Sequence, residues 1–449
     1  MFSKNQIVTI KIQDLGSEGE GVGRIDQFIV FVDQALPGEL VKVRLTEVKK
    51  SYAKGTIEQI LEPSPLRQQP PCSIYRQCGG CQLQHLSYAG QLQAKQKRVK
   101  DALERIGHFT DVQVQPCVPS SEIFSYRNKI QLPVVLSSKG TQIGFYQHRT
   151  HEIIDLENCL IHCKLGDQIF HEIKQKLLAS KVIPYNETTG TGELRHCLIK
   201  TATSSQEVLV TFITNGEASD HFHKFANDVF ASSSSIKGVV QNIKSDRSNT
   251  ILGKEYRTLA GRPYIYETIQ GLIFKVSSAS FFQVNPAQAA SLYEKVISLA
   301  NIDSNTTIVD AYCGVGTLTL LLAKRGKQVI GIDCVPDAIS DAKENAKQNE
   351  ISNVEFHCLP VENATSLLQK GEVVILNPPR TGCHELVLKA LTQQKIVYIS
   401  CNPATLARDL SILNQSGYQL KEACPFDMFP QTAHVETVVV MVKEHRTAP

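Results

Sequence analysis

The first sixty residues alternate apolar and polar side chains in short runs. The runs cover residues 7–12, 28–32, 40–45 and 55–61. A period of two predicts strands, and the glycines between the runs, together with Pro37-Gly38, predict tight turns. Short strands separated by tight turns are typical of small barrels. We therefore expect an OB-like β-barrel over residues 1–62.

A helical pattern follows a proline-rich linker. Residues 63–71 contain four prolines, and between residues 91 and 109 apolar side chains recur at helical spacing. The apolar stripe consists of Val99, Ala102, Leu103 and Ile106. Five basic residues fall largely outside it: Lys95, Lys97, Arg98, Lys100 and Arg105. The pattern predicts a surface helix that packs one face on the main body.

The remainder of the chain divides into two patterns. Residues 111–265 are rich in strand-like runs, at 129–136, 142–146, 197–203, 208–213 and 238–243. After Pro263, apolar strands alternate with helical segments, which is the pattern of βαβ units and a parallel sheet. We expect a central α+β region followed by a Rossmann-like α/β domain.

The first βαβ unit has the features of a nucleotide-binding fold. The buried strand 307–310 leads into a loop with Gly314 and Gly316 and then into a helix over 317–324. The next strand, 329–333, ends in Asp333, where such folds commonly bind a ribose diol. A G-x-G-x-x-G motif is absent, and this favours S-adenosylmethionine over a dinucleotide.

Three further strand ends bear polar residues. One buried strand ends in Asn377-Pro-Pro-Arg380, the next ends in Ser400-Cys-Asn-Pro403, and Glu436 opens the last. Carboxyl ends of parallel strands meet at the ligand crevice of an open α/β sheet, so Cys401 is expected there. Its thiol could be a nucleophile, a metal ligand or a small buried side chain. Glu436 could equally be an ordinary solvated strand end.

The cysteines indicate a second site. The chain has 13 cysteines, and Cys72, Cys78 and Cys81 lie within ten residues, with two glycines before the third. This density indicates a metal site rather than core packing. The fourth ligand has three candidates: Cys159, Cys163 and, less well placed, Cys117. Zinc usually takes two paired short loops, whereas three clustered cysteines and one remote ligand favour an iron–sulfur cluster.

Charge and composition are compatible with an RNA partner without requiring one. The net charge is +3, and residues 1–100 contain 14 lysines and arginines against 9 acids. The basic residues on the later strands of the barrel could bind nucleic acid or could form an ordinary charged surface. Phe124 and Tyr126 stand beside Arg127 and Lys129, a combination that can stack bases and contact phosphates.

The sequence offers no sign of a membrane or a secretory route. The amino-terminal residues lack a basic segment followed by an apolar one, and no apolar run approaches the ~18 residues of a membrane helix. We expect a soluble cytoplasmic protein without disulfides. Nothing in the sequence indicates an obligate protein partner.

Taken together, these motifs resemble the RNA uracil-5-methyltransferase family, in particular its iron–sulfur branch that modifies 23S ribosomal RNA. The most specific matches are Ser400-Cys-Asn-Pro403 and His434-Val-Glu436. The resemblance covers nearly the whole chain and implies three domains. These are a TRAM-like barrel over 1–62, a central RNA-binding and [4Fe-4S] domain over 63–265, and a class I methyltransferase domain over 266–449, on which the helix at 91–109 is expected to pack.

The resemblance also implies roles for individual residues. Cys401 would be the nucleophile and Glu436 the general base. S-adenosylmethionine would bind at Gln283, Tyr312, Asp333 and Asn377. The cluster ligands would be Cys72, Cys78, Cys81 and Cys159, which leaves Cys163 as an ordinary cysteine. Contacts to RNA are expected at Arg127, Lys129 and Arg380.

The implied chemistry requires these residue types. Carbon 5 of uracil is too weak a nucleophile to take a methyl group directly, so a thiolate must first add to carbon 6. The proton on carbon 5 must then be removed by a base, and an ionised carboxylate suits that step. The target nucleotide must leave any base stack, because the face of the ring is otherwise covered.

One residue departs from the family pattern, and four alternatives are to be weighed. The family has Asp where this sequence has Asn377, so the negative charge is lost while a carbonyl acceptor is kept. An RNA-binding homologue with impaired catalysis would fit that change. A methylase of exocyclic amines would have no use for Cys401, and tRNA could replace ribosomal RNA as substrate. The cysteine site could also be a redox module separate from catalysis.

Overall fold

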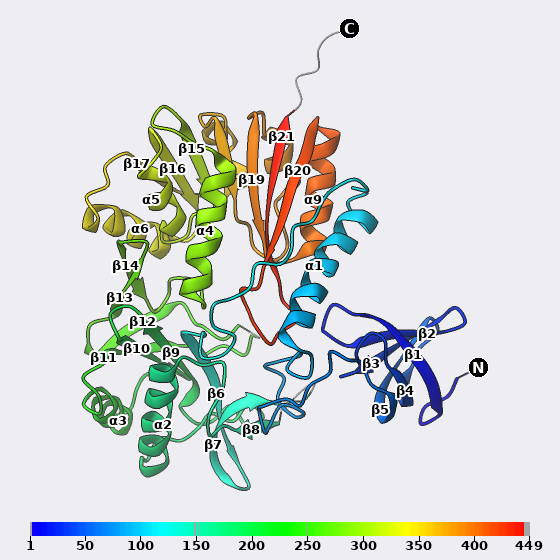
Figure 1. Cartoon of the computed structure of the whole chain (residues 1–449). Helices are drawn as coiled ribbons and strands as arrows, with labels where there is room; N and C mark the ends of the chain where they lie inside the picture. Colours follow the sequence, from blue (N-terminus) through cyan, green and yellow to red (C-terminus); the bar gives the residue numbers. More distant parts are fainter. Residues whose placement is uncertain (1, 148–149, 151, 249, 444–449) are drawn as a thin grey trace.

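The structure is a computed structural model that describes residues 2–147, 150, 152–248 and 250–443. It contains a small barrel, a seven-stranded central sheet and a seven-stranded α/β sheet (Figure 1). The helix α1 (Tyr88–Arg105) runs along the α/β part, on the side that faces the barrel. Within the described residues, no helix combines the length and the apolar character needed to cross a membrane.

The amino-terminal strands close into a barrel in the order β1-β2-β3-β5-β4. They are β1 (Ile7–Leu15), β2 (Gly21–Ile25), β3 (Phe28–Asp33), β4 (Leu40–Val48) and β5 (Tyr52–Glu62). The apolar positions of the alternating runs fill the interior, where Ile10, Val30 and Val43 are buried. At Gly55 a Cβ atom would lie 2.3 Å from Val43, so only glycine allows this close crossing. The predicted barrel is confirmed.

The central region contains one seven-stranded sheet in the order β12-β11-β10-β9-β6-β7-β8. Its strands are β6 (Lys129–Ser137), β7 (Gly140–Tyr146), β8 (Ile153–Asp155), β9 (Leu194–Ala202), β10 (Glu207–Thr214), β11 (Ile236–Ile243) and β12 (Glu255–Gly261). The helices α2 (Lys164–Ala179) and α3 (Asp220–Phe230) place Phe170 and Phe222 in the core on this sheet.

The second seven-stranded sheet has the order β17-β16-β15-β18-β19-β21-β20. Its strands are β15 (Thr307–Ala311), β16 (Gln328–Asp333), β17 (Val354–Cys358), β18 (Val373–Leu376), β19 (Lys395–Ser400), β20 (Tyr418–Phe426) and β21 (Glu436–Lys443). The first five pair in parallel, and β21 lies antiparallel between β19 and β20. The predicted Rossmann-like α/β domain is confirmed. Residues 444–449 of the predicted domain lie outside the described residues.

Helices cover both faces of this sheet. One core contains apolar residues of α4 (Pro286–Ala300), α5 (Thr317–Ala323) and α6 (Pro336–Gln348). The other contains residues of α1, α8 (Glu385–Ala390) and α9 (Pro403–Gln415), together with Leu368 of the short helix α7 (Thr365–Leu368) and Val361 of the 3₁₀ turn Val361–Asn363. These layers hold the carboxyl ends of the parallel strands in place.

Two features differ from the sequence predictions. The hairpin of β13 (Tyr264–Ile269) and β14 (Leu272–Ser277) precedes α4, where only βαβ units were expected. The second difference is in α1, where Val99 and Leu103 pack in the core as predicted but Lys95, assigned to the outer face, is only 1% exposed. Lys95 is buried because the distant Asp427 supplies a buried ionic partner.

Hydrogen bonds tie the central sheet to the segment before α4. The ammonium of Lys200, on β9, donates to the carbonyl oxygens of Ser277, Ser278 and Ser280 at 2.7, 3.0 and 2.7 Å. The backbone N–H of Asn128 donates to the carbonyl of Val284 at 3.0 Å. Since a buried carbonyl without a donor costs ~1–3 kcal/mol, these bonds fix the course of residues 277–284.

Candidate active site

Cys401 and Glu436 face each other across two neighbouring strands. The register of β19 and β21 pairs Ser400 with Thr437 as its last position, so Cys401 and Glu436 occupy the next opposing positions. Cys401 is half-buried, and Glu436 is 5% exposed. Two residues that are 35 positions apart in the sequence therefore meet at the carboxyl end of a parallel strand, where open α/β sheets bind ligands.

The protonation of this pair is set by burial and by one cation. Burial raises the pKa of Glu436 to about 8, and the guanidinium of Arg380 acts in the opposite direction. Burial also raises the pKa of the Cys401 thiol, as does the carboxylate of Glu436, whereas Arg380 lowers it through its charge and a hydrogen bond. Arg380 therefore favours the ionised form of both groups.

The loop after β18 that bears Arg380 is fastened to the start of α9. The side chains of Asn402 and Thr405 both donate to the carbonyl oxygen of Arg380 at 3.2 Å. Asn402 also caps α9, because its side-chain oxygen accepts from the N–H of Ala404 at 3.1 Å. The two rigid, proline-containing loops after β18 and β19 thus form one unit around Cys401.

The predicted donor-binding residues lie along the same edge of the sheet. Tyr312, Asp333 and Asn377 directly follow or end β15, β16 and β18, which are neighbours in the sheet. Asp333 accepts from the N–H of Gly314 at 3.0 Å and from that of Val335 at 2.9 Å, so its carboxylate is fixed in front of the glycine loop. This edge continues through β18 to Cys401 on β19.

Two features of the glycine loop are typical of a ligand site. Tyr312 has a φ of +69°, a conformation that a bulky side chain rarely adopts and that clusters at functional sites. A Cβ at Gly314 would meet no atom within 4 Å, so open space lies over the backbone there. Gln283 comes from the segment before α4, bonds to Tyr293 and is held through its carbonyl by Asn128 at 3.3 Å.

Comparison with known proteins identifies the family. The tRNA (uracil-5-)-methyltransferase family matches residues 87–444, and the TRAM domain matches residues 2–57. The chain belongs to this family of RNA methyltransferases. Because the match covers most of the chain, the resemblance read from Ser400-Cys-Asn-Pro403 and His434-Val-Glu436 is confirmed at the level of the family.

Individual relatives agree with this assignment. An RNA methyltransferase of Halalkalibacterium halodurans is 41% identical, over 98% of this chain and 97% of that protein. One from Clostridium acetobutylicum is also 41% identical with the same coverage. The crystal structure of Pyrococcus abyssi tRNA (uracil-54, C5)-methyltransferase with S-adenosyl-L-homocysteine superposes with a TM-score of 0.77 at 30% identity, over 97% of this chain and 100% of that one.

Asp310 is a residue of the proposed donor-binding edge that the sequence analysis of this methyltransferase did not name as a candidate. It lies near the end of β15, is 1% exposed and accepts from the Thr319 hydroxyl at 2.6 Å. Burial, and then the neighbouring Asp333, raise its pKa to about 7. In the sequence, Asp310 could be noticed only as an acid at the end of a buried strand, directly before the glycine loop. An acid in that position can equally begin an ordinary surface loop, so the sequence does not distinguish the two cases.

The four predicted cluster ligands of the methyltransferase come together. Cys72, Cys78, Cys81 and Cys159 line one cavity. Burial, followed by the proximity of the other three thiols, raises the pKa of Cys81 to about 12. In the part of the chain that the structure describes, no group of three histidine, cysteine or acidic side chains is close enough to hold a single metal ion.

The other two candidate cysteines lie elsewhere. Cys163 precedes the first residue of α2 and contacts the hydroxyl of Thr201. Cys117 is buried beside Asp427. Neither shares the cavity of the four cysteines, so the structure singles out Cys159 as the remote cysteine among those considered.

Arg127 and Lys129 lie between the cysteine cavity and the donor edge. Arg127 forms a β-bridge with His162, close to Cys159, and its side chain donates to the carbonyl of Lys129 at 3.0 Å. Lys129 opens β6 and is half-buried, and burial lowers its pKa. The residue between them, Asn128, holds the segment of Gln283. Arg380, also predicted to contact RNA, is exposed and lies against Cys401.

The pKa of Glu436 predicts how turnover depends on pH. The resemblance implies that Glu436 acts as a base, and a base must be ionised. A pKa of about 8 leaves Glu436 largely protonated at pH 7, so the rate should rise between pH 7 and pH 9. In Arg380→Met the midpoint should move to higher pH, because the cation that favours both ionised groups is lost. Single-turnover release of free methylated RNA from the enzyme, at saturating RNA, measures this midpoint, because the base acts after the methyl group has been transferred. Lys389→Met, on the exposed face of α8, is the matched control, and an unchanged midpoint in Arg380→Met would contradict the role of the guanidinium.

Proposed function

We propose that this methyltransferase transfers a methyl group from S-adenosylmethionine to carbon 5 of a uridine in RNA, with Cys401 as nucleophile and Glu436 as general base. The observation that supports this most directly is the facing of Cys401 and Glu436 at the end of β19, on the edge that also bears the donor-binding positions. The relative from Pyrococcus abyssi acts on carbon 5 of a uracil, as its name states.

Each step has a residue suited to it. The Cys401 thiolate adds to carbon 6 of the uracil ring, and the electron pair moves through the ring so that carbon 5 becomes nucleophilic. S-adenosylmethionine supplies the methyl group that carbon 5 takes. Glu436 then removes the proton from carbon 5, and the electrons of that C–H bond re-form the C5–C6 double bond as the Cys401 thiolate leaves.

The environment of Cys401 favours the thiolate at the moment it is needed. Cys401 directly precedes Asn402, the cap of α9, and the amino terminus of a helix stabilises negative charge. Arg380 adds a full positive charge beside the sulfur. Burial of Cys401 opposes both effects, so these two groups are needed to favour the thiolate.

The donor-binding residues fit S-adenosylmethionine. Asp333 can accept hydrogen bonds from a ribose diol, and its two backbone contacts hold the carboxylate in one orientation. The open space over Gly314 allows a ligand to approach the backbone. Gln283, Tyr312 and Asn377 complete the proposed site. Asn377 keeps a carbonyl acceptor and loses the charge of the family aspartate, and this is the only support for an RNA-binding homologue with impaired catalysis.

We also propose that Cys72, Cys78, Cys81 and Cys159 hold a [4Fe-4S] cluster. The four thiols line one cavity, and a cluster is larger than an ion, so it holds its thiolates farther apart. Three clustered cysteines and one remote cysteine favour a cluster over zinc, which usually takes two paired short loops. The cluster would stabilise the loop of residues 72–86 structurally.

For the substrate we propose 23S ribosomal RNA. The cysteine cavity supports this choice, because the branch of the family that the sequence resembles by these cysteines modifies ribosomal RNA. Transfer RNA is the second candidate, supported by the family description and by the relative from Pyrococcus abyssi.

The RNA would be bound by the barrel over 1–62 and by the region over 63–265, which bears Arg127 and Lys129. The domain over 266–449 would methylate it. Extruding the uridine costs a few kcal/mol, which these contacts would offset.

A labelling experiment tests the reaction and its nucleophile. Ribosomal and transfer RNA from a strain lacking the gene, incubated with a methyl-labelled donor, should yield labelled 5-methyluridine in ribosomal RNA, and the labelled fragment identifies the site. Cys401→Ala should abolish the label while RNA and donor affinities stay within about twofold, since only the attacking atom is lost. Cys358→Ala, at an exposed cysteine, is the control. Label in the Cys401→Ala reaction would exclude the covalent route.

Replacing the base should trap the intermediate. In Glu436→Gln the thiolate can still add and carbon 5 can still take the methyl group, but the proton on carbon 5 remains, so the C6–S bond persists. A protein–RNA adduct that survives denaturation should accumulate on gels and should carry the methyl label. The double variant Cys401→Ala with Glu436→Gln should form none. A Glu436→Gln protein that turns over without an adduct would assign the base elsewhere.

The cysteine site can be tested by metal content. Protein purified without oxygen should absorb in the visible range of iron–sulfur clusters and should contain iron and acid-labile sulfide. Cys81→Ser should lose both signals, whereas Cys163→Ser should keep them, because Cys163 lies outside the cavity. Stoichiometric zinc in place of iron would contradict the cluster.

A further inference from the structure

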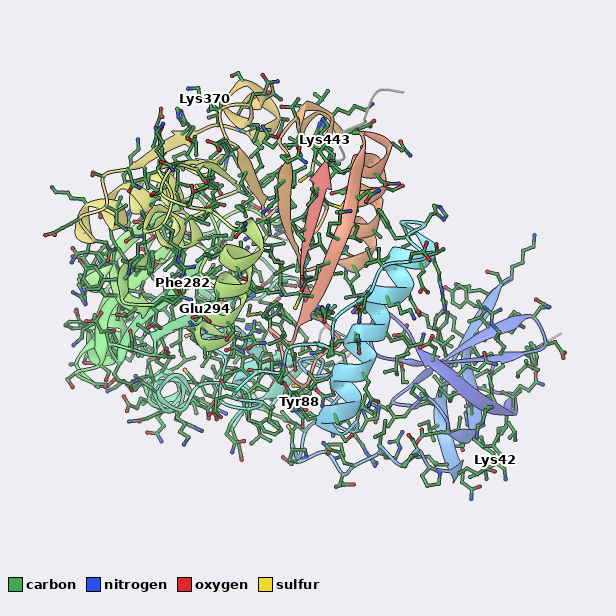
Figure 2. The ribbon with its side chains drawn as sticks, turned by 45° about the horizontal axis from the view of Figure 1, so that its top comes forward. Lys42, Tyr88, Phe282, Glu294, Lys370 and Lys443 are labelled. Atoms are coloured by element: carbon green, nitrogen blue, oxygen red, sulfur yellow. The ribbon has the colours of Figure 1, made fainter. Side chains whose placement is uncertain are left out.

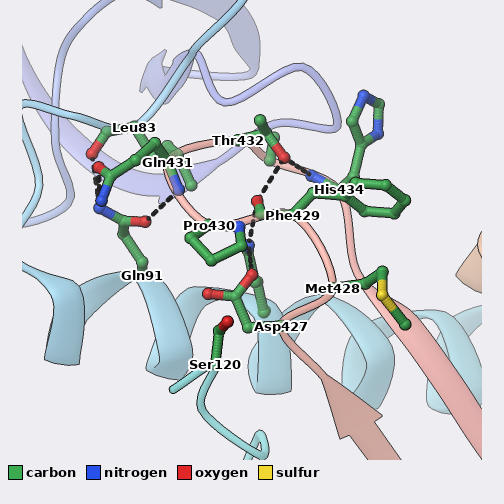
Figure 3. A network of polar contacts seen from close by, with 12 residues as sticks. Leu83, Gln91, Ser120, Asp427, Met428, Phe429, Pro430, Gln431, Thr432 and His434 are labelled. Atoms are coloured by element: carbon green, nitrogen blue, oxygen red, sulfur yellow. Dashed lines mark hydrogen bonds and ion pairs between the residues drawn. The ribbon is translucent and has the colours of Figure 1, made fainter. Parts of the chain in front are cut away.

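The loop that leads to Glu436 is buried, although loops usually run over the surface. Residues 427–435 connect β20 to β21, and the strand register pairs Phe426 with Glu436 where the loop begins and ends. Asp427, Met428 and Val435 are 0% exposed, and Gln431 is 1% exposed. Figure 3 shows this loop lying beside α1, with Gln431 next to Gln91 of the helix. A buried loop needs polar partners, and α1 supplies them.

A reciprocal pair of amides joins the helix to the middle of the loop. Gln91 of α1 accepts from the N–H of Gln431 at 3.0 Å and donates to the Gln431 side-chain oxygen at 3.0 Å (Figure 3). The Gln431 carbonyl accepts from the backbone of Gln82 and Leu83 at 3.0 and 2.9 Å. Gln431 has a φ of +70°, a conformation that persists only where surrounding contacts impose it.

Two cations of the same helix hold the rest of the loop. Lys95 forms a buried ion pair with Asp427 and donates to the Phe429 carbonyl at 3.1 Å. Arg98 donates to the Ala433 carbonyl at 2.5 Å. Gln91, Lys95 and Arg98 follow each other at helical spacing, so one stripe of α1 faces the loop. Figure 2 shows the course of α1, which begins at Tyr88, between the barrel that bears Lys42 and the α/β part.

The stripe of Gln91, Lys95 and Arg98 also selects one conformation of the loop. The attraction within a buried ion pair can be offset by the cost of removing both charges from water, and such pairs can serve instead to select one conformation. Here the conformation selected is that of the loop ending at Glu436. Cys401 is fixed independently, by its place after β19 and by the Asn402 cap of α9.

We propose that Gln91, Lys95 and Arg98 are positioning residues for the removal of the carbon 5 proton. They hold the loop so that the Glu436 carboxylate stays in reach of that proton, and they act on this step alone because the nucleophile is anchored elsewhere. The inference rests on the proposed function. The segment of residues 72–86 contacts the same loop, because the backbone N–H groups of Gln82 and Leu83 donate to the Gln431 carbonyl.

Accumulation of the methylated protein–RNA adduct distinguishes a positioning role of these residues from a merely structural one. Gln91→Met keeps the size of the side chain and removes its two hydrogen bonds with Gln431, together with those to the carbonyls of Leu83 and Leu86. Because a displacement of about 1 Å can cost roughly 10²-fold in rate, we expect kcat to fall by about ten- to a hundredfold. The methylated protein–RNA adduct should accumulate at least about tenfold above wild type, while the single-turnover rate of adduct formation and the KM for the donor change by less than about twofold.

Gln93→Met on the exposed face of the same helix is the matched control and should behave as wild type. Arg98→Met, which loses one hydrogen bond from a half-buried side chain, should show the same adduct accumulation more weakly and covers the case in which Gln91→Met does not fold. Folding of each variant is checked by circular dichroism. A fall in kcat without adduct, or an equal fall in adduct formation, would overturn the proposal.

The Glu436→Gln protein distinguishes this inference from the proposed function. If Glu436→Gln traps the adduct and neither Gln91→Met nor Arg98→Met does, the positioning role is wrong and the base assignment stands. If Glu436→Gln traps nothing, the base assignment fails and the positioning role fails with it.

Discussion

The site depends on the antiparallel pairing of β19 with β21. A purely parallel sheet would bring together only the carboxyl ends of its strands, whereas β21 runs the other way and places its first residue, Glu436, opposite Cys401. Side chains alternate between the faces of a sheet, so a slip of one residue would turn Glu436 away from the sulfur. The apolar run of β21, buried between β19 and β20, fixes that register.

At both Cys401 and Glu436, burial disfavours the ionised form that the proposed chemistry needs. Burial raises the pKa of both Cys401 and Glu436, yet each must be ionised in the proposed reaction. Arg380 opposes this effect of burial, because its charge lowers both pKa values. Its loop is fastened to α9, so the cation that tunes the pair is held by the helix that follows the nucleophile.

Parts of the chain distant from the reacting atoms support the site through buried polar contacts. Lys200 on the central sheet fixes the segment before Gln283, and Gln91 and Lys95 on α1 fix the loop before Glu436. Side chains on β9 and α1 thus hold in place two segments that lead to the methyltransferase sheet.

The sequence by itself determined whatever depends on local pattern. Alternation specified the barrel, the buried runs specified the parallel strands, and Ser400-Cys-Asn-Pro403 and the spacing of Cys72, Cys78 and Cys81 indicated the two sites. Only the tertiary structure decided which residues meet. Lys95 was predicted on the outer face of its helix because helical periodicity does not reveal a carboxylate 332 residues away that stabilises it when buried. The facing of Cys401 and Glu436 required the reversed insertion of β21, which results from long-range strand pairing and has no local signal.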